Sequence, residues 1–394
     1  MAKTKWNILA AYEDRVTTTE VQGKFFSEFK TDMWTRIWYR SDKFLCEENK
    51  KYKISIDANP GNCKVKYLVN WYDATGYRKY RSYMEKDAVV TAPESVVEFT
   101  IDVLFHTDTD AVCTLGDVEF ETVGEYEPKK VTMLAISNTL VEDRNSTHES
   151  TIDAYCEEID RIAEKEKPDL IVLTEHWHNM TNPPMALEDK FVTYDHPAVT
   201  RIAEKAKKYS CYISGSWHIL ENGNRYNRCL LFDRNGNIIA EYDKIHLTIM
   251  EYEMGITPGN KSVVVETDIG RIGFVICWDI WFPEMGQLLY KENCDIIVNP
   301  TRGWGDPQAN AISYVTGAYV ASSEHLKMTR IQDKSGSSID TVGDKHYAVA
   351  TVDINEPWWQ RALSIGEGHG EGRNIYKYER REDMYMPLTE EFHG

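Results

Sequence analysis

The hydrophobic pattern of this chain of 394 residues changes near residue 130. Before that point the chain consists of short stretches in which apolar and polar residues alternate, as in residues 51–56, 64–72 and 96–105. Turn-forming residues such as Asn59-Pro-Gly separate these stretches, and no helical period persists. Alternation with period two is typical of strands that bury one face, so the pattern predicts an all-β sandwich over residues 1–128.

Beyond residue 130, strands alternate with helices. The apolar run 131–136 predicts a strand, residues 147–167 carry apolar positions at helical spacing, and residues 169–173 predict the next strand. Two hairpins follow, the first of which closes with an Asn235-Gly turn. Strands, helices and hairpins mixed in this way indicate an α/β domain with a mixed sheet, which we place at residues 129–394.

Composition narrows the classes of partner. The 63 acidic residues outnumber the 45 basic residues, which gives a formal net charge of −18, and no basic run is longer than a Lys-Lys pair. Proteins that bind nucleic acid or anionic membranes usually present a basic stripe, so neither partner is expected. The acidity lies mainly on the second domain, where it would disfavour anionic substrates and mildly attract a cationic amine.

The cellular compartment is predicted from two further features. No window approaches the roughly 18 consecutive apolar residues of a membrane span, and no apolar signal segment follows the first residues. The 8 cysteines form no Cys-x-x-Cys pair, which is typical of reduced thiols in a reducing compartment. We therefore expect a cytoplasmic protein.

Cys277 lies where an apolar strand ends and a helix begins. Residues 273–276 are apolar, and Pro283 is typical of the first position of a helix. On such a turn, backbone N–H groups and a helix N-terminus favour the thiolate and can later bind an oxyanion. The alternative for this segment alone is a buried apolar cysteine at a strand end.

Two further polar residues end apolar strands. Glu175 follows residues 170–173, and a carboxylate at that end of a strand points into the crevice where α/β sheets bind ligands. Lys244 comes just after a hairpin strand. Taken singly, they could be a capping acid and a solvated lysine. Together with Cys277 they supply a base, a cation for an oxyanion and a nucleophile, which are the requirements of amide hydrolysis by a thiol.

The stretches 168–175, 242–248 and 270–279 resemble the nitrilase superfamily of carbon-nitrogen hydrolases, in which a Glu, a Lys and a Cys follow in this order. The likeness covers most of residues 131–388. It implies an α/β fold, a four-layer α-β-β-α sandwich that forms a homodimer or higher homo-oligomer and needs no cofactor or metal. It also implies hydrolysis of a small amide or N-carbamoyl amine through a thioester.

The resemblance also assigns roles. Cys277 would attack the substrate carbon, Glu175 would act as general base and acid, and Lys244 with the backbone N–H of Trp278 would hold the oxyanion. A second Glu often positions the Lys in this family. Glu251 and Glu253 both compete for that role; we favour Glu251 and keep Glu253 as a substrate contact or, alternatively, a solvated acid.

The residues after Cys277 bear on the substrate. Cys-Trp-Asp-Ile-Trp-Phe-Pro-Glu is similar to the nucleophile motif of N-carbamoylputrescine amidases. Trp281 stands where the commoner family form has Arg, so a carboxylate-binding Arg is missing at that position. Trp278 and Trp281 could form an apolar wall for the substrate or belong to the core. His176 and Trp177 are expected to line the pocket beside Glu175.

Other functions stay open at this stage. Nitrile hydrolysis by the same three residues is one alternative. Another is a glycan-binding or partner-binding protein with a vestigial hydrolase domain, because the aromatic residues of the first domain loosely resemble those of carbohydrate-binding β-sandwich or jelly-roll modules. His176 and His178 form a His-x-His pair, but no partner set at metal-site spacing accompanies them, so no metal is predicted.

Overall fold

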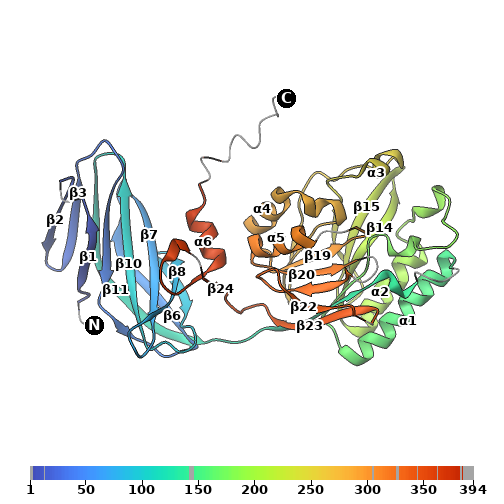
Figure 1. Cartoon of the computed structure of the whole chain (residues 1–394), viewed down its shortest axis with the longest axis horizontal. Helices are drawn as coiled ribbons and strands as arrows, with labels where there is room; N and C mark the ends of the chain where they lie inside the picture. The colour runs from blue at the N-terminus through green and yellow to red at the C-terminus, as the bar shows by residue number, and fades with distance from the viewer. Residues whose placement is uncertain are drawn as a thin grey trace. The chain divides into compact units, whose positions relative to one another are not determined.

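The computed structural model describes residues 3–12, 14–141, 146–303, 306–324, 328–343, 345–361, 363–381 and 384. The chain divides into two compact units, Met1–Glu127 with Pro357–Gly394, and Pro128–Glu356 (Figure 1). We call them the sandwich unit and the hydrolase unit. The sequence places the boundary at residue 128 and extends the second domain to residue 394, whereas the residues from Pro357 onward group with the sandwich unit. The difference arises because the carboxyl-terminal segment packs on strands of the sandwich unit.

The sandwich unit contains two sheets that enclose one apolar core, as the alternating pattern predicts. One sheet has the order β1-β4-β10-β7-β8-β25-β24 with β5 beside β10, and the other has the order β2-β3-β11-β6-β9. The strands are β1 (Trp6–Ala11), β2 (Val16–Val21), β3 (Lys24–Phe29), β4 (Thr35–Ser41), β5 (Phe44–Leu45), β6 (Lys50–Asn59), β7 (Lys64–Tyr72), β8 (Arg78–Met84), β9 (Asp87–Thr91), β10 (Glu98–Thr107) and β11 (Ala111–Glu125).

The carboxyl-terminal segment extends the first of these sheets. It contains β24 (Trp359–Gln360), β25 (His369–Glu371) and α6 (Gly372–Glu379). Strand β25 runs parallel to β8, with His369 opposite Tyr80, and the Asn374 side-chain amide donates to Ser82 Oγ at 3.0 Å. A pairing between residues almost 300 positions apart leaves no local pattern in the sequence. The expected domain boundary therefore did not take it into account.

The aromatic residues of the sandwich unit divide between core and surface. Tyr39 and Trp71 are buried in the core, whereas Trp34 is 50% exposed. The pattern of strands alone does not separate these positions, because both kinds occur on β-sheets.

The hydrolase unit contains two six-stranded sheets in the orders β16-β15-β14-β13-β12-β23 and β17-β18-β19-β20-β21-β22. The strands of the first sheet are β12 (Lys130–Ile136), β13 (Leu170–Val172), β14 (Tyr212–Glu221), β15 (Asn224–Phe232), β16 (Ile238–Asp243) and β23 (Tyr347–Asp353). Those of the second are β17 (Val264–Thr267), β18 (Gly270–Phe274), β19 (Ile296–Pro300), β20 (Tyr319–Ser323), β21 (Arg330–Gln332) and β22 (Ser338–Thr341). The main helices are α1 (His148–Glu166), α2 (Pro197–Tyr209), α3 (Ile249–Glu253), α4 (Pro283–Lys291) and α5 (Asp306–Thr316).

The two sheets and their helices form the predicted α-β-β-α sandwich (Figure 1). Strand β12 shows why: Val131, Met133 and Ala135 enter the core between the sheets, while Leu134 and Ile136 enter the core beneath α1 and α2. A strand buried on both faces reads as a nearly continuous apolar run, and β12 is apolar and buried from Met133 to Ile136. Helix α1 begins after the capping residue Thr147, within one residue of the expected start.

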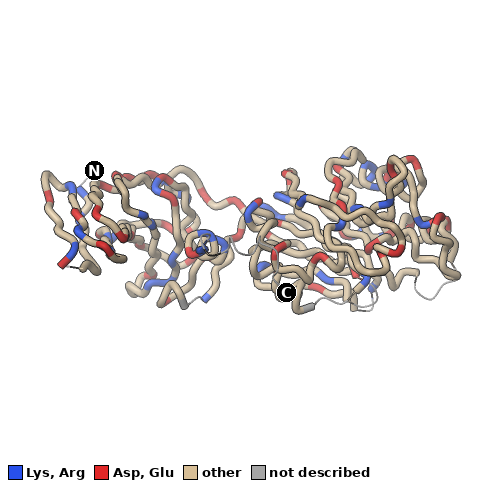
Figure 2. Tube along the Cα trace, turned by 90° about the horizontal axis from the view of Figure 1, so that it is seen from above, with Lys and Arg blue, Asp and Glu red and all other residues tan. Residues whose placement is uncertain are grey.

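Acidic and basic residues are interspersed along the chain trace (Figure 2). Among the described residues, no helix has the length and apolar character that crossing a bilayer requires.

Candidate active site

Three strand ends bring the candidate residues together. Glu175 lies three residues after β13, Lys244 directly after β16, and Cys277 three residues after β18. Glu175 and Lys244 are almost completely buried, and Cys277 is partly exposed. The Lys244 ammonium donates to Glu175 Oε1 at 3.0 Å, and the Glu175 carboxylate acts electrostatically on the Cys277 thiol.

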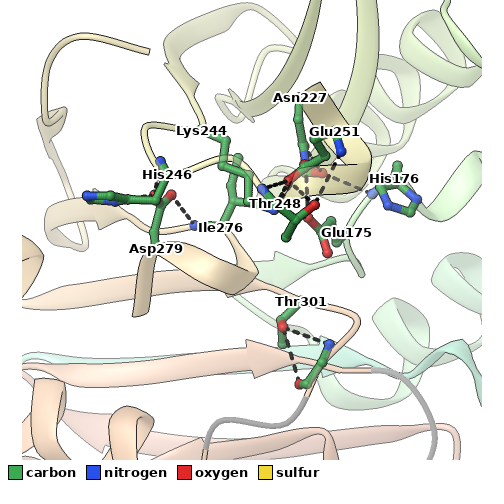
Figure 3. A network of polar contacts seen from close by, with 12 residues as sticks. Glu175, His176, Asn227, Lys244, His246, Thr248, Glu251, Ile276, Asp279 and Thr301 are labelled. Carbon is green, nitrogen blue, oxygen red and sulfur yellow. Dashed lines mark hydrogen bonds and ion pairs between the residues drawn. The ribbon is translucent and has the colours of Figure 1, made fainter. Parts of the chain in front are cut away.

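Glu251 completes the ion-pair cluster around Lys244 (Figure 3). Its two carboxylate oxygens lie 3.0 and 2.9 Å from Lys244 Nζ. Thr248, the capping residue of α3, donates from its backbone N–H and its hydroxyl to Glu251 Oε2 at 2.8 and 3.0 Å. The capping box at the start of α3 therefore fixes the carboxylate that faces the lysine.

Asn227 on β15 bridges the two carboxylates. Its Nδ2 donates to Glu175 Oε1 at 2.9 Å and to Glu251 Oε1 at 2.7 Å, while its Oδ1 accepts from the Ser216 hydroxyl at 2.8 Å. These contacts leave one orientation of the amide and hold both acids beside Lys244. Sequence reasoning missed Asn227; the available signal was one amide side chain in the buried part of β15.

Cys277 occupies a strained turn. Its φ of 47° lies in the left-handed region, which is uncommon for a residue other than glycine. It opens the short helix η4 (Cys277–Trp281), and the Thr301 side chain and the Arg302 backbone N–H, which follow β19, both act to lower the pKa of its thiol. Backbone strain held in place by its surroundings is typical of functional sites.

Asp279 anchors the same turn and was also missed. It is fully buried and accepts a hydrogen bond from the Tyr242 hydroxyl at 2.7 Å. It also accepts from the His246 backbone N–H at 2.8 Å and the Ile276 backbone N–H at 3.1 Å (Figure 3). The carboxylate thus ties η4 to the segment that carries Lys244. Its place two residues after Cys277 was the only hint in the sequence.

Electrostatics keep the cluster charged. Burial raises the pKa of Glu175, but the Lys244 ammonium and the hydrogen bonds to the carboxylate outweigh it, so its pKa lies below the ordinary value. Burial lowers the pKa of Lys244, yet the negative charge of Glu175 and then the Cys277 and Glu251 groups raise it overall. Both residues are therefore ionised at neutral pH.

The thiol is held in its neutral form. Burial and then the negative charge of Glu175 raise the pKa of Cys277 to about 11, and these effects outweigh the opposing influence of Lys244 and Thr301. The sequence suggested that the turn would favour a thiolate. The structure differs because the neighbouring carboxylate and the burial are stronger than the local N–H groups.

The candidate residues border a cavity of about 430 Å³. Its wall includes Glu175, Lys244, Glu251 and Cys277, together with His176 as expected. The other members of the wall are Asn179, Lys190, His218, Thr248, Met250, Met254, Arg302 and Gly303.

Four other expected substrate contacts do not line this cavity. Trp177 is fully buried and packs against Trp217 with ring centroids 6.0 Å apart, because it faces the core beneath the helices. Trp278 and Trp281 are 37% and 44% exposed and contact each other on η4. Glu253 is exposed, two residues beyond the carboxylate that reaches Lys244.

Within the described part of the chain, no group of three or more His, Cys, Asp or Glu side chains is arranged to hold a metal ion.

A family model described as carbon-nitrogen hydrolase matches residues 132–361, more than half of the chain. The chain belongs to the carbon-nitrogen hydrolase family. It is thus a carbon-nitrogen hydrolase of the nitrilase superfamily.

Curated relatives are similar over parts of the chain. An N-carbamoylputrescine amidase of Solanum tuberosum is 25% identical over 229 residues, which is 49% of this chain and 73% of that protein. A hydrolase of Schizosaccharomyces pombe is 30% identical over 113 residues, 26% of this chain and 35% of its own length. An omega-amidase of Homo sapiens is 33% identical over 109 residues, 25% of this chain and 40% of its own length. The matches to the last two relatives therefore span less than half of each protein.

Solved structures share the fold. A carbon-nitrogen hydrolase from Helicobacter pylori G27 has a TM-score of 0.55 at 16% identity, covering 68% of this chain and all of that chain. An amidase from Nesterenkonia sp. has a TM-score of 0.52 at 16% identity, covering 67% of this chain and 98% of that chain.

Proposed function

We propose that this carbon-nitrogen hydrolase cleaves a small amide or N-carbamoyl amine through a thioester on Cys277. The observation that carries the proposal is the meeting of Glu175, Lys244, Glu251 and Cys277 at one cavity, although they come from four separate segments. A nucleophile, a base and a cation within reach of one another meet the requirements of acyl transfer.

In the first half of the reaction, Cys277 Sγ attacks the carbonyl carbon while the thiol proton passes to Glu175. Transfer during attack is consistent with a thiol whose pKa is raised to about 11 beside a carboxylate whose pKa is lowered. Lys244 and the backbone N–H of Trp278 bind the oxyanion. The tetrahedral intermediate then collapses, Glu175 protonates the departing nitrogen, and a thioester and an amine or ammonia result.

In the second half, water attacks the thioester and gives its proton to Glu175. The tetrahedral intermediate expels the sulfur, which regains a proton from Glu175, and the acid is released. Glu251 acts as a positioning residue: it and Asn227 hold Lys244 and Glu175 in place throughout. Dimerisation, carbohydrate binding by the sandwich unit and a cytoplasmic location stay predictions.

Ammonia release from a panel of primary amides and N-carbamoyl amines tests the proposal. We expect Cys277→Ala to abolish turnover, and Cys46→Ala to leave it unchanged, since Cys46 is the other partly exposed cysteine and lies in the sandwich unit. Iodoacetamide should label Cys277 first, and substrates should protect it. Full turnover by Cys277→Ala would refute the thioester.

A further inference from the structure

The cavity carries two cations that the proposed mechanism does not use. Lys190 ends the short helix η3 (Glu188–Lys190), and Arg302 follows Thr301 beyond β19; both line the cavity. Within the described residues, neither side chain takes part in an ion pair or a hydrogen bond. The charged groups of the wall are thus three cations and two carboxylates, although the chain as a whole carries a charge of −18.

Two neutral imidazoles share the cavity wall with these cations. His176 and His218 stack with ring centroids 4.4 Å apart. Burial and then the positive charge of Arg302 hold the pKa of His176 well below its ordinary value. Burial and then His176 do the same for the pKa of His218, and Lys190 contributes in the same direction. Arg302 therefore acts on one ring and Lys190 on the other.

The hydrogen bonds of Asn179 fix the tautomer of His218. Asn179 Nδ2 donates to the Lys190 carbonyl at 3.1 Å, so this atom is the amide nitrogen, and it also lies 3.0 Å from His218 Nδ1. Nδ1 must accept, and the neutral ring then carries its proton on Nε2. His218 is 3% exposed, and its Nε2 has no partner. A buried N–H donor without an acceptor lies in the wall beside two free cations.

We propose that the cavity selects amides that carry a carboxylate, which Arg302 and Lys190 bind with the Nε2–H of His218. Guanidinium and ammonium groups form charge-assisted hydrogen bonds with carboxylates, and a cationic substrate would meet two uncompensated positive charges. This preference is opposite to the one expected from the net charge. The charged groups that line the cavity determine the substrate preference, because exposed charges farther away than about 8 Å are largely screened at physiological ionic strength. The inference rests on the proposed function, since it concerns the same cavity.

Three amides of similar length test the selection: succinamate, butanamide and 4-aminobutanamide. We expect kcat/KM to be highest for succinamate and lowest for 4-aminobutanamide. Arg302→Gln and Lys190→Gln should each lower the ratio of kcat/KM for succinamate to that for butanamide by about 10- to 100-fold, mainly through KM. Lys261→Gln, which removes an exposed lysine that does not line the cavity, should leave the ratio unchanged.

A binding measurement separates this inference from the proposed mechanism. Full-length Cys277→Ala should bind succinamate more tightly than butanamide in calorimetry, and adding Arg302→Glu should reverse the preference toward 4-aminobutanamide. Equal binding of the three amides, or a ratio that the Arg302 and Lys190 variants do not change, overturns the inference even if turnover depends on Cys277. If turnover does not require Cys277, the proposed mechanism is wrong, and the binding measurement alone then decides whether the cavity prefers carboxylates.

Discussion

Each unit of the chain buries an ion-pair cluster, and the two clusters differ in their surroundings. In the sandwich unit, Asp102 is fully buried, accepts two hydrogen bonds from Arg40 at 2.7 and 2.8 Å, and accepts one from Arg81 at 2.8 Å. We call these three residues the closed cluster. In the hydrolase unit, Lys244 lies between Glu175 and Glu251, and we call these residues the open cluster.

The closed cluster satisfies its donors within the protein. The other nitrogens of Arg81 donate to Asn70 Oδ1 and to the Ile365 carbonyl, and no member of the cluster lines either of two cavities bordered by β7. The open cluster borders the 430 Å³ cavity beside a thiol in strained backbone. A buried ion pair is therefore weak evidence of function by itself; access to a cavity and a strained nucleophile distinguish the candidate active site.

The largest expected effect follows Glu175→Gln. Loss of the base should lower kcat/KM for an amide substrate by about 10³- to 10⁴-fold, at the upper end of what general acid-base catalysis contributes. Thermal unfolding should change little, because Lys244 keeps Glu251 as a partner. Steady-state kinetics and a melting curve on the same preparation measure both.

Glu253→Gln is the matched control, since Glu253 is exposed outside the cavity. It should retain the turnover of the unchanged protein. If Glu175→Gln keeps its activity and instead melts at a much lower temperature, the open cluster is structural and the contrast between the clusters fails.

Asp102→Asn should have the opposite signature. It leaves two arginines without their shared carboxylate, so the free energy of unfolding should fall by about 3–5 kcal/mol, as for other buried pairs that lose one partner. Folded molecules should retain full kcat/KM. Urea denaturation measures the loss, and Asp57→Asn, which breaks the exposed pair with Lys24, should change stability by about 1 kcal/mol or less. Equal stability losses in the two variants would contradict the distinction between closed and exposed pairs.

Sequence reasoning reached the ends of strands but not the contacts between them. Glu175, Lys244 and Cys277 were predicted as site residues because each follows an apolar strand, a pattern that is local in the chain. Asn227 depends on register: it lies opposite His218 on the neighbouring strand, and a shift of one residue would turn it to the other face.

The same limit explains the other differences. The pairing of β25 with β8 joins distant residues, so the sequence pattern assigned β24, β25 and α6 to the second domain, whereas they pack with the sandwich unit. Trp177 was expected beside the substrate because it follows His176, but consecutive residues of a turn point in different directions and Trp177 enters the core. The two cations of the cavity besides Lys244 come from η3 and from the segment after β19, which the sequence does not mark as neighbours.

Asp279→Asn tests whether a buried, hydrogen-bonded aspartate in the hydrolase unit serves catalysis rather than stability alone. Asp279 is buried and fully hydrogen-bonded like Asp102, yet it supports the turn of Cys277. We expect kcat to fall by about 10- to 100-fold with a smaller change in KM, because a hydrogen bond to a charged group contributes about 1.5–3 kcal/mol. Tyr242→Phe, which removes one of these bonds and keeps the charge, should lose less. A larger effect on KM than on kcat would show that Asp279 does not act through the nucleophile.

The smallest effect, and the sharpest distinction between the clusters, concerns the thiol itself. Burial and then the charge of Glu175 raise the pKa of Cys277 to about 11. Removing a negative neighbour favours the thiolate, so Glu175→Gln should lower this pKa, and alkylation by iodoacetamide at pH 8 should become faster although turnover is nearly lost. The alkylation rate is measured from pH 7 to 11. The double variant Glu175→Gln/Cys277→Ala gives the background rate of the other cysteines, which is subtracted. Asp102→Asn should leave the profile unchanged, because the closed cluster belongs to the sandwich unit and the thiol to the hydrolase unit. A profile that Glu175→Gln does not shift, or shifts upward, would mean that Glu175 is not the charged neighbour of Cys277, and the proton transfer proposed between them would fail with it.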